Sequence, residues 1–227
     1  LRKKVFTWRE EGYPGISKTS NILLNWWFGN LRINNNQDES FDYYFAQREA
    51  VETVIFLTEY INVIDKNDLL RFDNLGVINL KNIEETWRRY VIKMATGSGK
   101  TKVISLLLTW SYFHKKYEEN SELSKNFLII APNIIVLDRL KSDFEGLKIF
   151  STDPVLPDDG FENKNWKSDF QLTIHLQDDI HILNPLGNIF LTNIHRLYEE
   201  KENQLDEEDY SLDYFAGKKP KIDTNTS

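Results

Sequence analysis

The residues best suited to chemistry lie together in one octapeptide, MATGSGKT, at residues 94–101. A polyphosphate needs several N–H donors that converge on it, and only a loop with glycines turns tightly enough to bring the backbone that close. A helix that begins at Lys100 would add its first N–H groups and the positive end of its dipole. The stretch therefore predicts a phosphate-binding loop. Its backbone donors would come from Ala95, Thr96, Gly97, Ser98 and Gly99.

Two side chains at the end of this loop have the types that a nucleotide site requires. The Lys100 ammonium would neutralise the β- and γ-phosphates as the catalytic cation, and the Thr101 hydroxyl would bind Mg²⁺. Met94 departs from the general pattern G-x-x-x-x-G-K-[ST], which has glycine at that position. The plain alternative is a Gly-Ser-Gly turn that only caps a helix. The complete run that ends in Lys-Thr favours the nucleotide site.

This loop needs a strand before it and a helix after it, and the hydrophobic pattern predicts both. Residues 90–93 form a short β-like run, and residues 100–114 have the spacing of an amphipathic helix. The apolar face of that helix comprises Val103, Leu106, Leu107, Trp110 and Phe113. The loop is therefore expected between a strand and a helix.

The alternation of strands and helices continues toward the C-terminus. Residues 126–131 are a continuous apolar run typical of a buried parallel strand, and residues 134–144 predict a helix. Two more strands are predicted at residues 170–176 and 188–192. This order predicts an α/β fold with a mostly parallel sheet flanked by helices. Residues 1–45 are rich in aromatic side chains, and we expect them to pack as a layer on this core.

Composition narrows the class of protein. The 227 residues include 41% hydrophobic and 28% charged side chains, and no apolar run is long enough to span a membrane, so no membrane partner is expected. The absence of cysteine excludes disulfides and Cys-ligated zinc, and it suits the reducing cytoplasm, where we expect the protein. A net charge of −7 disfavours nucleic acid, although a motor can confine positive charge to one groove. Because the chain begins with Leu1 and shows no signal segment, we expect that an upstream part has been removed.

The octapeptide resembles motif I of superfamily 2 helicases, above all the branch found in type I and type III restriction enzymes. Three further stretches resemble motifs of that branch in the same order: residues 45–51 with Gln47, residues 129–140, and residues 190–197. The resemblance is to the DEAD/DEAH-box helicase part of type III restriction enzyme Res subunits. It covers about residues 41–198.

This resemblance implies a fold, an activity and partners. Residues 41–198 would form an incomplete first RecA-like P-loop domain with three layers, after an N-terminal extension at 1–40 and before an acidic-then-basic connector or frayed end at 199–227. The cofactors would be ATP and Mg²⁺. The intact protein would be an ATP-dependent helicase or translocase on duplex DNA, part of a restriction endonuclease, with a modification or specificity subunit as a further candidate partner.

The resemblance also assigns roles to single residues. Gln47 would select adenine, since a side-chain amide donates and accepts at once. The path of the DNA backbone would be bordered by Pro132, Arg139, Thr192 and Asn193. Each role has a plainer alternative. Gln47 would be only a polar residue at a helix start, Arg139 a solvated residue, and Thr192 with Asn193 caps of the next short helix.

ATP hydrolysis by such a motor also needs two carboxylates at the end of a neighbouring strand. The Asp-Glu pair that begins at Asp38 precedes the loop, and the pair that begins at Asp206 follows polar residues that cannot form a buried strand. We reject both pairs and expect the true pair beyond Ser227. Residues 1–227 would then bind ATP without hydrolysing it at a useful rate.

Two other classes of protein stay open. A P-loop kinase or transport ATPase would use the same loop, but it would carry the glycine that Met94 replaces and would lack the glutamine motif. A non-hydrolysing nucleotide-binding scaffold module would suit the net negative charge. The ordered set of motifs favours the helicase.

Overall fold

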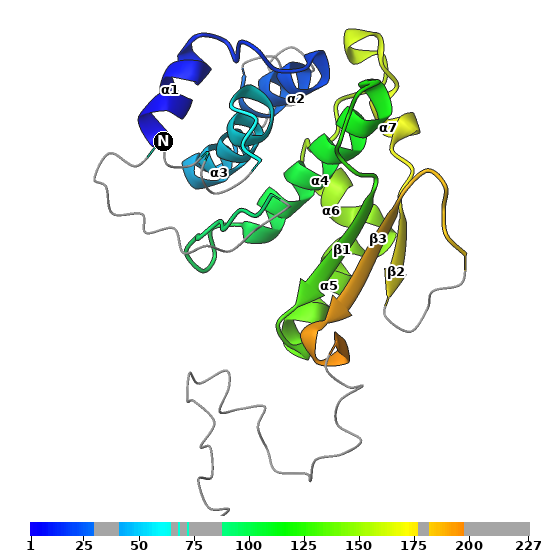
Figure 1. The fold of residues 1–227 in the computed structure, drawn as a ribbon. Coiled ribbons are helices and arrows are strands. Elements are labelled where there is room, and N and C mark those ends of the chain that lie inside the picture. Colours follow the sequence, from blue (N-terminus) through cyan, green and yellow to red (C-terminus); the bar gives the residue numbers. More distant parts are fainter. Residues whose placement is uncertain (30–40, 65–67, 69–71, 73–87, 177–181, 198–227) are drawn as a thin grey trace, which may run out of the picture.

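The computed structural model describes residues 1–29, 41–64, 68, 72, 88–176 and 182–197 (Figure 1). The expected connector at 199–227 and both rejected Asp-Glu pairs lie outside the described residues. A layer of helices from the N-terminal part packs on one long helix, and a small sheet with its own helices lies on the opposite side of that helix.

Three parallel strands make up the sheet. They are β1 (Asn126–Ala131), β2 (Thr173–Leu176) and β3 (Asn188–Asn193), in the order β1-β3-β2. β3 lies in the middle and is mostly buried, as its apolar run requires. The prediction of an α/β fold with a parallel sheet is confirmed, and the arrangement is compatible with a RecA-like domain.

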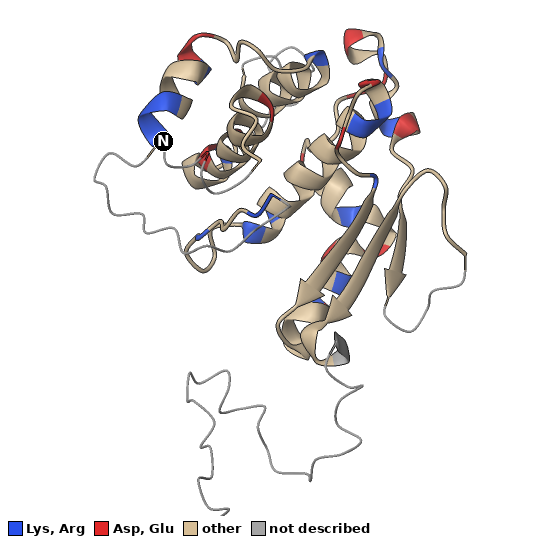
Figure 2. Cartoon of the chain, viewed as in Figure 1, with Lys and Arg blue, Asp and Glu red and all other residues tan. Residues whose placement is uncertain are grey.

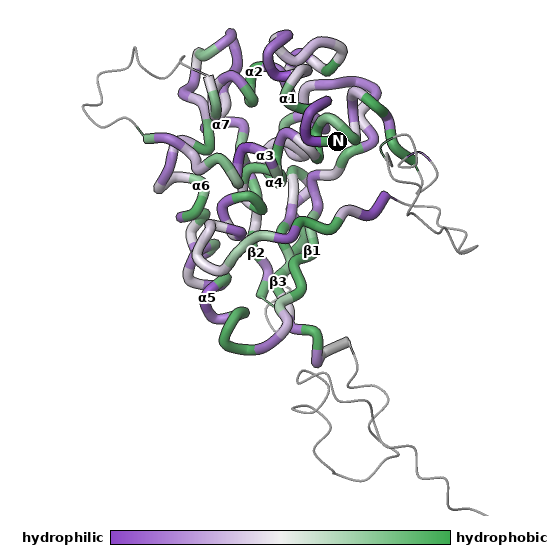
Figure 3. Tube along the Cα trace, turned by 90° about the vertical axis from the view of Figure 1, so that its left-hand side faces the viewer, coloured by the Kyte–Doolittle hydropathy of each residue, from purple (hydrophilic) through white to green (hydrophobic). Residues whose placement is uncertain are grey.

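One face of the sheet is covered by helices. α5 (Ile134–Phe144) packs on β1 and β3, and α6 (Lys148–Thr152) lies next to it. Side chains of a strand alternate between faces, so Leu128 and Ile130 of β1 point the other way and are 60% and 42% exposed. The middle residues of β1 and β3 are apolar, and both strands are mostly green in Figure 3. Within the described part of the chain, this second face has no helical layer.

The helix that follows the glycine loop, α4 (Lys100–Tyr117), joins the sheet to the helical layer. It begins at the predicted residue and buries most of the predicted apolar face, with Leu107 half-buried. The connections after α5 contain the short helices η4 (Glu145–Leu147), η5 (Phe161–Asn163), α7 (Trp166–Asp169) and η6 (Ile194–Leu197). None of the described helices is both long and apolar enough to cross a membrane.

The N-terminal helical layer consists of α1 (Arg2–Glu10), α2 (Lys18–Phe28), α3 (Phe45–Ile55) and the π-helix η2 (Phe56–Tyr60). Its tryptophans are core residues, as predicted, whereas Phe6, Phe45 and Tyr60 are exposed. Trp8 packs edge-on against Tyr13 and Phe56, with ring centroids 4.8 and 5.3 Å apart. The Trp27 indole is fully buried and donates to the Val155 carbonyl at 2.8 Å. The layer is therefore tied to the rest of the chain.

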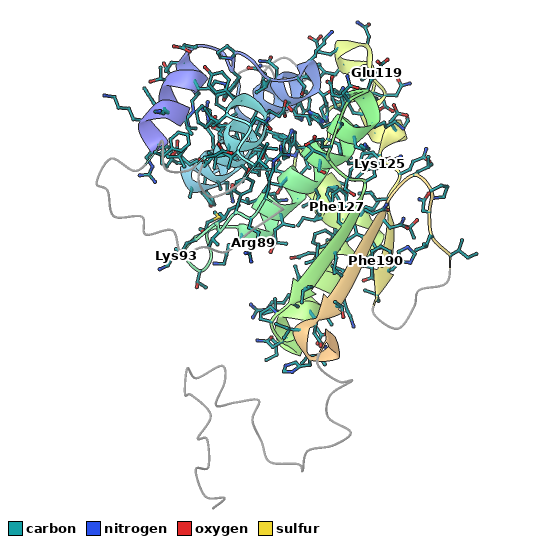
Figure 4. The ribbon with its side chains drawn as sticks, in the orientation of Figure 1. Arg89, Lys93, Glu119, Lys125, Phe127 and Phe190 are labelled. Atoms are coloured by element: carbon teal, nitrogen blue, oxygen red, sulfur yellow. The ribbon has the colours of Figure 1, made fainter. Side chains whose placement is uncertain are left out.

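Two strand predictions need correction. Residues 90–93 are not a strand: they have no regular structure, and Val91 is 96% exposed. Arg89 and Lys93 lie away from the strands that carry Phe127 and Phe190 (Figure 4). An extended run becomes a strand only with a hydrogen-bonded neighbour, and this run has none among the described residues. The strand predicted at 170–176 begins at Thr173, because its partner β3 begins at Asn188.

Candidate nucleotide-binding site

The predicted phosphate loop extends from Met94 to Gly99 and leads directly into α4. Gly97 and Gly99 have φ angles of 78° and 80°, a left-handed conformation that favours glycine. The Ser98 N–H and hydroxyl both donate to the Ala95 carbonyl, at 3.3 and 2.7 Å, and close a tight turn. The 18-residue helix that follows directs its first N–H groups and the positive end of its dipole toward the loop. This geometry suits a bound anion.

Lys100 and Thr101 form the first turn of α4. The Lys100 ammonium donates to the carbonyls of Met94 at 3.0 Å and Ala95 at 2.8 Å, so it lies over the loop. Its side chain is exposed, and a phosphate is a stronger acceptor than two neutral carbonyls. Thr101 is half-buried. It lines a cavity of about 310 Å³ together with Gly99, Lys102, Asp143, Lys148, Ile149 and Thr152.

Gln47, the predicted adenine selector, lies against this loop. Its side chain is buried; its Oε1 accepts from the Tyr44 N–H at 3.0 Å, and its Nε2 donates to the Ser98 carbonyl at 3.1 Å. The first bond belongs to a capping box at the start of α3, so the plainer role as a helix-start residue is met. An amide has two donor hydrogens and two acceptor lone pairs, and these bonds use one of each. Gln47 can therefore cap α3 and still contact a base.

The residues predicted to border DNA are only partly brought together. β1 and β3 are in register with Ala131 opposite Asn193, so Pro132, Thr192 and Asn193 lie at the same carboxyl edge of the sheet. Pro132 is exposed and Thr192 is half-buried, but Asn193 is only 7% exposed. Arg139 lies farther along α5 and is exposed. The edge itself offers little positive charge, since the three strands contain no Lys, Arg, Asp or Glu (Figure 2).

One ion pair beside the loop was not predicted from the sequence. Lys102 of α4 forms a salt bridge with Asp153 and also donates to the Ile149 carbonyl at 3.4 Å. The pair fixes the start of α4 against α6. Lys102 directly follows the octapeptide, but no sequence signal links it to Asp153. Among the described residues no group of three His, Cys, Asp or Glu side chains could hold a metal ion, which leaves Thr101 as the predicted Mg²⁺ contact.

The loop, its glutamine and the parallel sheet can now be compared with known proteins. The sequence model of the family described as "Type III restriction enzyme, res subunit" matches residues 40–215. The chain belongs to this family. The Res family is a DEAD/DEAH-like helicase family, and its members are helicase-type ATPases of restriction enzymes. No curated protein and no solved structure matches the chain at a significant level.

The residues of the candidate site fall within the range that the family model matches. The matched range contains Gln47, the phosphate loop and all three strands, while α1 and α2 precede it. The residues of the loop fit a nucleotide's phosphates, because its two left-handed glycines carry no side chain over the backbone N–H groups. A Cβ at Gly99 would lie 2.1 Å from the Gln47 amide nitrogen, so this position requires glycine.

Proposed function

We propose that this Res-family chain binds ATP with Mg²⁺ in the loop at residues 94–101 and that it is the ATP-binding part of a helicase or translocase on duplex DNA. The observation that carries this proposal is the loop itself. Gly97 and Gly99 expose its backbone at the N-terminus of α4, and Gln47 contacts its Ser98 carbonyl from another helix. A plain helix cap would need neither the second glycine nor the glutamine.

Each residue of the loop has a separate task in this proposal. The backbone N–H groups of residues 95–99 bind the phosphate oxygens, and Lys100 leaves its two carbonyl acceptors for the β- and γ-phosphates. The Thr101 hydroxyl holds Mg²⁺, which when bound neutralises charge on the phosphates. Gln47 uses its remaining donor and acceptor on the adenine edge.

The DNA part of the proposal rests on the carboxyl edge of the sheet. Pro132 and Thr192 lie there on adjacent strands, and exposed Arg139 follows on α5 as a cation for the phosphate backbone. Asn193, which is 7% exposed, would support this edge rather than contact DNA. The protein would act in the cytoplasm, with a modification or specificity subunit as a partner. Residues 1–227 alone would bind ATP without turnover, because neither Asp-Glu pair of the sequence follows an apolar run.

Titration of the chain with a fluorescent ATP analogue tests the nucleotide site. Lys100→Ala is expected to weaken binding about 10- to 100-fold, since a hydrogen bond to a charged group contributes about 1.5–3 kcal/mol. Lys167→Ala is the matched control, because Lys167 is an exposed lysine on the distant helix α7. Equal affinity of wild type and Lys100→Ala would contradict the proposal. Phosphate release in the presence of duplex DNA tests the second part, and rapid turnover by residues 1–227 would contradict it.

A further inference from the structure

A cluster of charged side chains lies buried between α1 and α3, outside the loop that binds phosphate. It consists of Arg9, Tyr13, Arg48, Glu49 and Glu52, and we name it the α1–α3 charge cluster. The Arg9 side chain is 10% exposed, that of Glu49 11%, and that of Glu52 fully buried. Charges are rarely buried to this extent, since each loses its hydration. The cluster therefore calls for an explanation.

Its geometry fixes one helix on the other. The Arg9 Nε donates to both carboxylate oxygens of Glu52, at 3.0 and 2.9 Å, and its Nη2 donates to Glu49 at 2.6 Å. The Tyr13 hydroxyl donates to Glu52 at 2.6 Å, and the Arg48 Nε donates to the same oxygen at 2.7 Å. A buried pair of this kind adds little net stability compared with apolar residues, but its planar, forked bonds define a position closely.

Two members of the cluster, Arg9 and Tyr13, also keep their protons at neutral pH. Burial alone would lower the pKa of Arg9, but its hydrogen bonds to Glu52 and Glu49 outweigh burial and raise that pKa. Burial and the charge of Glu52 raise the pKa of the Tyr13 hydroxyl, so it remains a donor at neutral pH. Arg9 and Tyr13 therefore both remain hydrogen-bond donors at neutral pH.

Tyr13 adds a second, independent sign of constraint. Its φ is 60°, a left-handed conformation that a tyrosine seldom adopts. Such conformations persist where the surroundings over-determine them, and they gather at functional sites. Here the surroundings are the ring of Trp8, 4.8 Å away between centroids, and the carboxylate of Glu52. The conformation of the turn between α1 and α2 therefore places the Tyr13 hydroxyl against Glu52.

The cluster lies directly next to Gln47 of the nucleotide site along α3. Arg48 and Glu49 directly follow Gln47 in α3, and α3 lies between α1 and α4 (Figure 1). The Gln47 amide reaches the Ser98 carbonyl at 3.1 Å, a distance that a shift of α3 by about 1 Å would carry beyond hydrogen-bonding range. The contact of α3 with the phosphate loop thus depends on where α1 holds α3.

We propose that the α1–α3 charge cluster positions Gln47 for the choice of adenine, so that Arg9, Tyr13 and Glu52 are positioning residues of the nucleotide site. The inference rests on the proposed function and extends it to α1, which lies before the residues that the family model matches. In this proposal α1 helps to position the nucleotide site and also packs on the core.

The ratio of ATP to GTP affinity, measured by calorimetry on the chain, tests this inference, because packing alone would not change that ratio. Tyr13→Phe keeps the ring and removes one donor to Glu52. It is expected to lower the ratio about three- to tenfold. Arg9→Lys, which keeps the charge but loses the fork, is expected to lower it in the same direction. Tyr117→Phe is the matched control, since the Tyr117 hydroxyl likewise donates to a carboxylate, that of Asp169, at 2.8 Å at the far end of α4.

A combined variant separates positioning from general damage. In a Gln47→Ala background, Tyr13→Phe is expected to leave the ATP to GTP ratio unchanged, since the residue that it positions is gone. If Tyr13→Phe lowers the melting temperature and leaves the ratio intact, the cluster is structural only and the inference is overturned. Equal affinity of the unmodified chain for ATP and GTP would overturn it too. Failure of the proposed function looks different, because then ATP binding would not depend on Lys100.

Discussion

The helical layer of α1–α3 and the sheet of β1–β3 bury their side chains to different degrees. Trp8, Trp27 and Glu52 in or against the helical layer are at most 2% exposed, whereas Leu128 and Ile130 of β1 are 60% and 42% exposed. The first region is held on its inner side by aromatic and charged contacts, and the second is covered on one face among the described residues. The phosphate loop lies at the start of α4 and contacts the helical layer through the hydrogen bond from Gln47 to the Ser98 carbonyl.

This difference shows which region gives the site its rigidity. Gln47 comes from the densely packed layer, while the predicted DNA contacts at Pro132 and Thr192 come from the open sheet edge. A nucleotide site needs side chains held within a fraction of an ångström, and packing provides that. We therefore expect substitutions in the helical layer to affect nucleotide binding and folding, and substitutions on the open sheet face to affect neither strongly.

The largest expected effect follows from deleting a core side chain of the helical layer. Trp27→Ala should lower the free energy of unfolding by about 3–5 kcal/mol, because it removes a fully buried ring and its bond to the Val155 carbonyl. Leu128→Ala on the open face should change it by no more than about 0.5 kcal/mol. Urea unfolding followed by fluorescence and circular dichroism measures both. A similar loss in the two variants would mean that the open face is covered in solution.

The next effect contrasts the two glycines of the loop. Both have left-handed φ, so an alanine at either costs about 1–2 kcal/mol of strain. A Cβ at Gly97 meets nothing within 4 Å, whereas a Cβ at Gly99 would lie 2.1 Å from the Gln47 Nε2. Gly99→Ala should therefore weaken ATP at least about tenfold more than Gly97→Ala, since it also displaces Gln47. In a Gln47→Ala background the two variants should differ less, and an unchanged difference would refute the role of this contact.

Features that neighbouring residues determine could be predicted from the sequence, and features that depend on distant residues could not. The loop, α4 and α5 were predictable because their determinants are contiguous: two glycines before Lys100, and Asn133, whose side chain caps α5 by accepting from the Val136 N–H at 2.9 Å. The strand predicted at 90–93 was wrong because strand formation depends on a neighbour that local sequence does not specify.

The part of the site that sequence could not reveal depends on distant pairs. Arg9 and Glu52 are 43 residues apart, and Gln47 and Ser98 are 51 apart. Acidic residues at spacing 3 on a helix, such as Glu49 and Glu52, indicate only that a cation could meet that face. No local rule identifies the cation as Arg9, or shows that Gln47 contacts the loop as well as capping α3.

A smaller effect concerns the pH dependence of the helical layer through Glu59 of η2. Burial would raise the pKa of Glu59, but the His114 imidazole 3.6 Å away, together with hydrogen bonds from the Ser20 hydroxyl and the Ser17 N–H, outweighs burial and lowers it. A carboxyl group with a lowered folded-state pKa contributes stability that is present above its ordinary value of 4.5 and is lost as the pH falls through the folded-state pKa. We expect the melting temperature to fall below about pH 4.5, and to fall less steeply in Glu59→Gln. Parallel profiles would assign the acid sensitivity to other groups.

The smallest expected effect is that of removing an exposed ion pair, and it contrasts with the effect of removing a buried one. Lys167 and Asp158 form an ion pair at 2.5 Å, but their side chains are 58% and 50% exposed, so water and salt screen it. Lys167→Met should change the free energy of unfolding by less than about 1 kcal/mol, and the change should shrink further in 1 M salt. Arg9→Met leaves the fully buried Glu52 carboxylate without its forked partner, and it should cost about 3–5 kcal/mol at either salt concentration. If the two substitutions had equal, salt-sensitive effects, the α1–α3 charge cluster would be solvated in solution and could not fix the position of α3.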